Sequence, residues 1–507
     1  MFGKMLEDLN LLPVFGNPGT TEIPMLTDVD DYVLALHDGV AAGIAEGYAI
    51  SSGKPSIVNL HTELGIGNAM AFLITASRNR TPLIVTAGQQ DQRHLAYDPL
   101  LSGDLTGLGD RFAKYSYEIR RPSDIAYVMR KAYQIAEEPP KGPVFLSFPM
   151  DVMESDGNYS KEGVAISEYE VADSEDVRKV AEAIMESNNP AIVFGSEIDE
   201  FRAFDEAVEF ARKLGCPVYS EPLGNRSSYP SDDQQYAGEL FPAEILISLQ
   251  LMQNDLILFI GSDLTLYPYT IDTVLPGIRK ISIGMNSTRR IGETYRANPR
   301  TFLRKIIPMV QRKCSFARGK DYMKFTDAMR EKKRMGYRYV SYRISKYFGD
   351  YALVDEAISM SETLRHYFGY RPNGYFTARS GQIGWALPAS IGMSMNDPRV
   401  LSVIGDGSLM YSIQALWTAR HYGVPLKMII LRNSGYNILR SYAMSYYPSL
   451  KDADFLRPEP DIEGVISSYG VDVRTADSDL RNLEWLRSGS DQKALVIDVD
   501  RSIPRMF

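Results

Sequence analysis

The sequence predicts an α/β protein made of three doubly wound parallel-sheet domains. Short apolar runs alternate with helical patterns along most of the chain, as parallel strands joined by crossover helices require. A chain of 507 residues is long enough for about three domains. A polar stretch at 154–175 and a basic stretch at 312–343 interrupt the alternation, so we expect domains at 1–153, 176–312 and 344–507.

The composition excludes several classes of protein. A hydrophobic fraction of 44% and a charged fraction of 23% are those of an ordinary globular protein. A net charge of −9 argues against nucleic-acid binding, which needs a basic surface. The sequence has no apolar run long enough to span a membrane and no signal-like pattern at its start, so we expect a cytoplasmic protein. Cys216 and Cys314 are too few and too distant in the sequence to suggest a metal cluster or a disulfide framework.

The first two domains are expected to follow the same alternation of strand and helix. In the first domain, an amphipathic helix at 1–11 and helices at 39–51 and 65–76 accompany strands at 14–15, 32–36, 56–60, 83–88 and 143–148. In the second, the strands are expected at 191–194, 217–220, 256–260 and 280–283. We interpret the basic stretch that follows as a solvated helical connector, with an anion-binding patch as the alternative.

The third domain carries the strongest functional pattern. A strand at 399–404, a helix at 412–422 and a strand at 426–431 form a βαβ unit, and the last strand is expected at 494–498. Ligands bind beyond the carboxyl ends of such strands, where the sequence places Asp406 and Asn433. Their oxygen atoms, with a nearby backbone carbonyl, suit Mg²⁺ bridging a diphosphate. Gly-Asp-Gly alone is more often a turn, but the paired Asn433 favours a site.

This motif resembles the thiamin diphosphate motif, which begins with Gly-Asp-Gly and ends in Asn. Further matching stretches lie at 15–20, 43–49, 59–61 with 67–70, 82–90 and 405–425. On these stretches the chain resembles the thiamin diphosphate-dependent 2-oxo acid decarboxylases and carboligases, and among them most resembles the benzoylformate decarboxylases. The resemblance implies a pyrimidine-binding, a central and a diphosphate-binding domain. It also implies a homodimer at least, with a homotetramer common in the family.

The resemblance also implies roles for cofactor-binding residues. The metal ligands would be Asp406, Asn433 and the Gly435 carbonyl. The bulky apolar residue that holds the cofactor bent would be Ile383, for which a core isoleucine is the alternative. The remaining contacts to thiamin diphosphate would come from Ser359, Gly381, Gly407, Ser408 and Tyr436.

Three residues match catalytic positions of the family. Asp38 stands where the family has a glutamate that contacts the pyrimidine ring, and it is one methylene shorter; a residue that caps the strand end is the alternative. His61 matches a proton-transferring histidine. Thr20 matches a serine that contacts the substrate carboxylate, with a turn residue as the alternative. Leu439 and Tyr442 match residues of the substrate pocket, and core packing is their alternative.

The chain departs from the family pattern at several positions. Pro268 stands where the family has its second active-site histidine, and Tyr267 or Tyr269 could replace that histidine. Arg432 and Gln382 replace an asparagine and a glycine and could narrow or polarise the pocket. We expect Glu63 to be an acid of a surface loop, although it could act as a substitute acid beside His61.

Together these features predict an enzyme that uses thiamin diphosphate and Mg²⁺ to decarboxylate a small 2-oxo acid to an aldehyde. The residues expected at the pocket favour an aromatic or apolar side chain on the substrate. Carboligation, as in acetolactate synthase, is the first alternative. A thiamin diphosphate-binding protein with weak or no catalysis is the second, and flavin binding by the central domain stays open.

Overall fold

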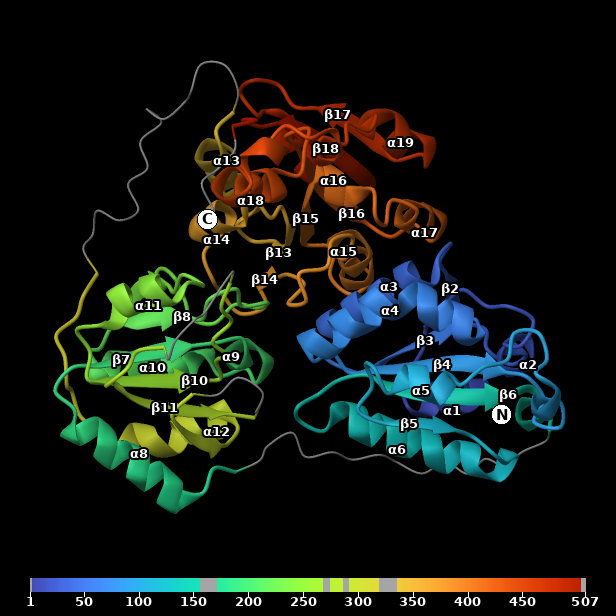
Figure 1. Cartoon of the computed structure of the whole chain (residues 1–507), viewed down its shortest axis with the longest axis horizontal. Coiled ribbons are helices and arrows are strands. Elements are labelled where there is room, and N and C mark those ends of the chain that lie inside the picture. The colour runs from blue at the N-terminus through green and yellow to red at the C-terminus, as the bar shows by residue number, and fades with distance from the viewer. Residues whose placement is uncertain (1, 156–170, 268–273, 286–290, 319–334, 503–507) are drawn as a thin grey trace.

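The computed structural model describes residues 2–155, 171–267, 274–285, 291–318 and 335–502. The described chain forms three six-stranded sheets, in which all paired strands run parallel. Figure 1 shows each sheet as the centre of its own domain, with helices on its faces. The predicted fold class is therefore confirmed. Most of the polar stretch at 154–175 and the middle of the basic stretch at 312–343 lie outside the described residues.

The first domain has the strand order β2-β1-β3-β4-β6-β5. Its longest helices start within three residues of the predicted positions: one residue separates α4 from the fully buried β3, and three residues separate α3 from β2. The strands are β1 (Val14–Gly16), β2 (Tyr32–Leu34), β3 (Ser56–Leu60), β4 (Leu83–Gln89), β5 (Ser116–Glu118) and β6 (Val144–Pro149). The helices are α1 (Phe2–Asp8), α2 (Ile23–Leu26), α3 (Asp38–Ser52), α4 (Thr62–Asn79), α5 (Leu105–Gly109), α6 (Ile125–Glu137) and α7 (Met150–Met153).

The central domain has the strand order β12-β11-β10-β7-β8-β9. Its strands are β7 (Pro190–Phe194), β8 (Val218–Ser220), β9 (Tyr236–Glu239), β10 (Leu256–Ile260), β11 (Arg279–Gly284) and β12 (Glu293–Arg296). Its helices are α8 (Ser174–Glu186), α9 (Glu197–Glu200), α10 (Phe204–Leu214), α11 (Glu244–Leu251) and α12 (Pro299–Ile306).

The third domain has the strand order β14-β13-β15-β16-β18-β17. Its strands are β13 (Ala352–Glu356), β14 (Tyr375–Phe376), β15 (Val400–Gly405), β16 (Leu426–Arg432), β17 (Asp472–Thr475) and β18 (Gln492–Asp498). Its helices are α13 (Tyr337–Phe348), α14 (Ser361–Phe368), α15 (Ala386–Ser394), α16 (Asp406–Leu409), α17 (Ala415–His421), α18 (Asn437–Tyr446), α19 (Ile462–Ser468) and α20 (Asn482–Arg487). The helix expected at 412–422 corresponds to α17 alone, which is shorter because residues 411–414 form turns between α16 and α17.

The first and third domains share one topology. Numbered within each domain, both sheets read 2-1-3-4-6-5. In this order the chain reverses direction across the sheet between the first and third strands, and ligands bind beyond the carboxyl ends of those strands. In the first domain this point lies at the ends of β1 and β3. In the third domain it lies at the ends of β13 and β15.

The two domains of shared topology pack through α3 and α15, which Figure 1 shows side by side. Small residues let the helix backbones approach closely. A Cβ atom on Gly47 would lie 2.0 Å from the Ala389 carbonyl oxygen, and one on Gly392 would lie 1.9 Å from that of Ile44. Larger side chains at these positions would push the first and third domains apart.

Buried ion pairs join all three domains. The Asp263 carboxylate of the central domain lies 2.6 Å from Arg80 Nη2 of the first domain and 2.9 Å from Arg379 Nη2 of the third. Among the described residues, no helix combines the length and the hydropathy that crossing a lipid bilayer demands.

Candidate active site

The predicted metal ligands of the third domain lie at the ends of neighbouring strands. β15 and β16 pair in parallel with Gly405 opposite Leu431, so Asp406 and Asn433 follow the same edge of the sheet. The backbone N–H of Ser434 donates to Asp406 Oδ2 at 2.8 Å, which holds the two strand ends together. The Asn433 side chain accepts a hydrogen bond from Gly435 N at 3.2 Å.

The surroundings of Asp406 fit a bound cation. Its side chain is buried, and burial raises its pKa, although N–H groups of Ser434 and Gly407 oppose that shift. A buried carboxylate is stabilised when a positive charge lies beside it. The Asp406 carboxylate, the Asn433 amide and a backbone carbonyl are oxygen ligands of the kind that Mg²⁺ accepts. These residues would hold the metal and, through it, a diphosphate.

The residues predicted to contact the diphosphate surround the same strand ends. Ser359 follows β13, and Gly407 and Ser408 lie in the first turn of α16, after β15. A Cβ atom at position 407 would lie 2.6 Å from Cε1 of Tyr436, so a larger residue would have to displace that ring. Tyr436 therefore lies directly against the turn that would receive the phosphate groups.

Ile383 lies in the loop 381–384, outside the hydrophobic core of the third domain. It is half-buried, so the alternative of a core isoleucine is wrong. Gly381 and Gly384 adopt positive φ angles of 75° and 92°, which favour glycine. The buried Glu356 carboxylate accepts hydrogen bonds from the backbone N–H groups of Gly384 and Ala386 and so fixes the end of this loop. The sequence analysis missed Glu356, which is the last residue of the mostly buried strand β13 and has no motif of its own.

Asp38 is buried at the start of α3. The N-cap of this helix is His37, whose Nδ1 accepts from Gly39 N. The Asp38 carboxylate accepts long hydrogen bonds from Asn17 and Asn68 side chains, at 3.4 and 3.3 Å, and from His61 N at 3.4 Å. It therefore lies next to the ends of both β1 and β3, where this fold places its ligands.

His61 is oriented by a glutamate that the sequence analysis missed. His61 Nδ1 lies 2.8 Å from Oε2 of Glu22, which is fully buried. The Glu22 carboxylate also accepts from the backbone N–H groups of Gly19, Thr62 and Gly88, at 2.8, 3.2 and 2.8 Å. Because it already accepts from these donors, it is held as an acceptor for Nδ1–H. This arrangement leaves Nε2 of His61 for proton transfer.

The predicted substrate-contacting residues are accessible. Thr20 is exposed on the turn after β1. Leu439 is 50% exposed on α18, so core packing is wrong for this residue. Tyr442 lies on the same helix, with its ring 4.8 Å from the ring of Tyr446.

The structure places several departures from the family pattern. The Arg432 guanidinium pairs with Asp498 and Glu463, at 2.8 Å each, which neutralises its charge at the sheet edge. Gln382 Oε1 accepts from the Thr75 hydroxyl of the first domain at 2.5 Å. Glu63 lies in the first turn of α4, so its prediction as a loop residue is wrong. Tyr267 is 50% exposed, while Pro268 and Tyr269 lie outside the described residues.

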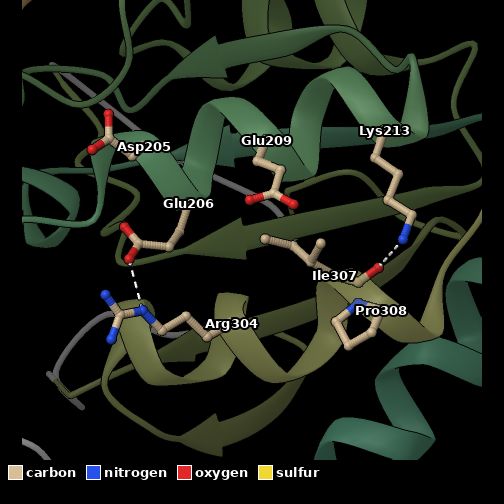
Figure 2. A pocket seen from close by; sticks show the side chains of 7 residues that line it. All are labelled: Asp205, Glu206, Glu209, Lys213, Arg304, Ile307 and Pro308. Atoms are coloured by element: carbon tan, nitrogen blue, oxygen red, sulfur yellow. Dashed lines mark hydrogen bonds and ion pairs between the residues drawn. The ribbon is translucent and has the colours of Figure 1, made fainter.

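A separate cavity of about 490 Å³ lies on the central domain between α10 and α12. Figure 2 shows acidic side chains of α10 along one wall, with Glu206 paired to Arg304 and Lys213 donating to the Ile307 carbonyl. None of the predicted site residues lines it. This cavity is therefore distinct from the candidate active site.

Comparison with known proteins assigns the chain to a class. Family models for thiamine pyrophosphate enzymes match at residues 1–108 (N-terminal TPP binding domain), 177–306 (central domain) and 358–499 (C-terminal TPP binding domain). The two TPP binding domains coincide with the two halves of the site described above. The chain is thus a three-domain thiamin diphosphate enzyme.

Full-length relatives narrow this class. The chain is 30% identical to benzoylformate decarboxylase of Pseudomonas aeruginosa, over 93% of this chain and 92% of that protein. It is 24% identical to the acetolactate synthase large subunit of Lactococcus lactis, over 98% of this chain and 91% of that protein. The crystal structure of benzoylformate decarboxylase from Polynucleobacter necessarius superposes with a TM-score of 0.93 at 29% identity, covering 99% of this chain and 98% of that one. The structure of a 4-hydroxybenzoylformate decarboxylase of Rhodococcus jostii superposes with a TM-score of 0.90 at 27% identity, covering 99% of both chains. The chain belongs to the family of thiamin diphosphate-dependent 2-oxo acid decarboxylases.

Proposed function

We propose that this protein decarboxylates a 2-oxo acid with an aromatic or apolar side chain to the corresponding aldehyde. The observation that carries the proposal is the oriented pair of His61 and Glu22 at the ligand-binding point of the first sheet, together with Asp406 and Asn433 at the ends of β15 and β16 of the third sheet. When bound, thiamin diphosphate supplies the electron sink for the loss of carbon dioxide. Asp406, Asn433 and the Gly435 carbonyl would hold its Mg²⁺.

The chain's own side chains bind and orient the substrate and move protons. His61 gives and takes a proton at Nε2, because Glu22 holds its Nδ1–H. The exposed hydroxyl of Thr20 is placed to bind the substrate carboxylate. Leu439 and Tyr442 would receive the apolar side chain, and Asp38 would supply the acid that contacts the pyrimidine ring of the bound cofactor.

A complete site requires a second copy of the chain. Among the described residues, no hydrogen bond or ion pair joins Asp38 or His61 to Asp406 or Asn433. Large apolar side chains beside the first half-site are exposed: Ile23 by 55%, Leu36 by 48% and Leu64 by 55%. Exposed apolar side chains that gather around a site favour a protein interface. We therefore propose a homodimer that pairs the half-sites, with a homotetramer as the full assembly.

Carboligation is the second candidate function, supported by the acetolactate synthase relatives. The two reactions share cofactor and first step, so product analysis separates them. Incubation with a single 2-oxo acid should give an aldehyde, and a hydroxyketone as the main product would support carboligation.

Binding of the cofactor is tested by thermal unfolding. Thiamin diphosphate with Mg²⁺ should raise the melting temperature of the wild type, because a ligand that binds only the folded state stabilises it. Asp406→Ala should abolish the rise, whereas Asp205→Ala, a variant of an exposed acid on the central domain, should keep it. A wild type that shows no rise would contradict the proposed cofactor site.

A further inference from the structure

The two cysteines of the chain lie in contact, although 98 residues separate them. Cys216 Sγ is 3.0 Å from Cys314 Sγ, and both are free thiols. Their wide separation in the sequence therefore does not keep the two sulfur atoms apart in space. Sequence separation did not reveal the contact, because the chain after α12 returns across the central domain to the end of α10.

Backbone contacts hold the two cysteines together without help from the sulfur atoms. The N–H groups of Lys313 and Cys314 donate to the Leu214 carbonyl at 2.8 and 3.0 Å, and that of Phe316 donates to Gly215 at 3.0 Å. Gly215 permits this approach, since a Cβ atom there would lie 2.3 Å from the Cys314 carbonyl oxygen. The segment 313–316 is thus fixed against the end of α10.

The two thiols differ in their access to solvent. Cys216 is fully buried in the apolar core of the central domain, and burial together with its contact to Cys314 raises its pKa. Cys314 is partly exposed, and its Sγ lies 3.8 Å from the Pro190 carbonyl at the start of β7. A dissolved oxidant can therefore reach Cys314, while Cys216 can react only with its neighbour.

We propose that Cys216 and Cys314 form a reversible disulfide that clasps the segment 313–316 to the central domain, with a small-molecule disulfide such as glutathione disulfide as oxidant. The Cys314 thiolate attacks one sulfur of the oxidant and releases the first glutathione thiolate. Cys216 then gives up its proton and attacks Cys314 Sγ, which expels the second. One S–S bond breaks and one forms, two protein thiols are oxidised, and their two protons leave with two molecules of glutathione.

Forming this bond needs only a small movement. A disulfide has an S–S distance of about 2.05 Å, so the sulfur atoms must approach by about 1 Å. The bond would close a loop of 98 residues that includes β8 to β12. Cross-linking a long loop restricts the unfolded chain, so oxidation should stabilise the protein. Neither half of the candidate active site lies on this segment.

The test uses the full-length protein after equilibration with reduced glutathione or with glutathione disulfide. The melting temperature is measured on one portion. A second portion is unfolded in guanidinium chloride with iodoacetamide present, so that the buried Cys216 is also alkylated if it is free, and its intact mass is measured. The reduced protein should carry two labels and the oxidised protein none, with a peptide that links Cys216 to Cys314. Oxidation should raise the melting temperature by roughly 5–10 °C.

Two variants keep the test specific. Cys314→Ser, at the partly exposed position, and Cys216→Ala, in the core, should each show no rise in melting temperature on oxidation. Cys314→Ser keeps the assay valid if Cys216→Ala fails to fold. Two labels on the protein after oxidation, a link between two chains, or an equal rise in a single-cysteine variant would overturn the proposal.

Discussion

Nδ1 of His61 lies 2.8 Å from a carboxylate oxygen of Glu22, which is 0% exposed and accepts four further hydrogen bonds. A carboxylate with so many donors cannot turn away, so the imidazole is held in one orientation and one tautomer. The two residues come from different segments of the first domain, because Glu22 lies between β1 and α2 whereas His61 follows β3.

Glu22→Gln tests this orientation. The amide would bring an N–H group against the donors that Glu22 now satisfies, so we expect a loss of stability of about 1–3 kcal/mol. We also expect kcat/KM to fall by about 10²-fold or more, because the proton-transferring imidazole loses its position. Steady-state kinetics and a melting curve check both effects.

The comparison variants are His61→Ala and Glu206→Gln. Combining Glu22→Gln with His61→Ala should lower the rate little beyond the loss seen in His61→Ala, since the two residues act as a unit. Glu206→Gln, in the ion pairs of α10 with α12, should leave the rate unchanged. Full activity in Glu22→Gln would show that His61 does not depend on Glu22.

Asp38 is tested by changing its charge and its length. Asp38→Asn removes the acid and should lower turnover by about 10²-fold or more, a loss typical of a misplaced catalytic group. Asp38→Glu adds one methylene, which gives this side chain the length of the glutamate expected at the position from the family resemblance. This variant should raise turnover. Both variants should keep the thermal shift by thiamin diphosphate and Mg²⁺, because Asp406 lies on another domain. Unchanged turnover in both would place Asp38 outside the site.

The close packing of α3 on α15 predicts a large effect from a single methyl group. Gly47→Ala would place a Cβ atom 2.0 Å from the Ala389 carbonyl, and such overpacking destabilises by about 1–3 kcal/mol. Gly67→Ala is the matched control on α4, where no atom lies within 4 Å of the new Cβ, and it should stabilise by about 0.4–1 kcal/mol. Melting curves of the two variants compare them directly, and equal stability would contradict the packing.

A buried glutamate in the α3–α15 contact predicts a pH dependence. Burial raises the pKa of Glu46 to about 7, although Trp385 Nε1 and Asn79 Nδ2 donate to it at 2.7 and 2.8 Å and oppose the shift. The folded state therefore holds Glu46 protonated where the unfolded chain has already lost the proton. Its contribution to stability is fullest below about pH 4.5 and falls until about pH 7, by about 3 kcal/mol in all.

Glu46→Gln removes this dependence. The wild-type melting temperature should fall more steeply between pH 5 and 7.5 than that of the variant. Burial also raises the pKa values of Glu197 and Glu356 to about 7. Both residues remain in the variant, so its melting temperature should still fall with rising pH, but less steeply. Parallel curves for the two proteins would mean that Glu46 is already ionised in the folded state at low pH.

The sequence was most informative where function depends on neighbouring segments. Asp406 and Asn433 could be placed at adjacent strand ends because one βαβ unit connects them. Glu22 could not be linked to His61, since the contact crosses 39 residues and depends on how the turn after β1 folds back. The only indication in the sequence was that Glu22 is an acid directly before the apolar residues of α2. The contact of Cys216 with Cys314 depends on a return of the chain across a whole domain, which no local pattern encodes.

Release of carbon dioxide from a panel of 2-oxo acids tests the central claim most directly. The panel pairs benzoylformate and its 4-hydroxy derivative with pyruvate and a branched aliphatic acid, in the presence of thiamin diphosphate and Mg²⁺. We predict the fastest release from the aromatic acids, one aldehyde for each carbon dioxide, and no release by Asp406→Ala. A wild type that binds the cofactor but releases carbon dioxide from none of these acids would contradict the account.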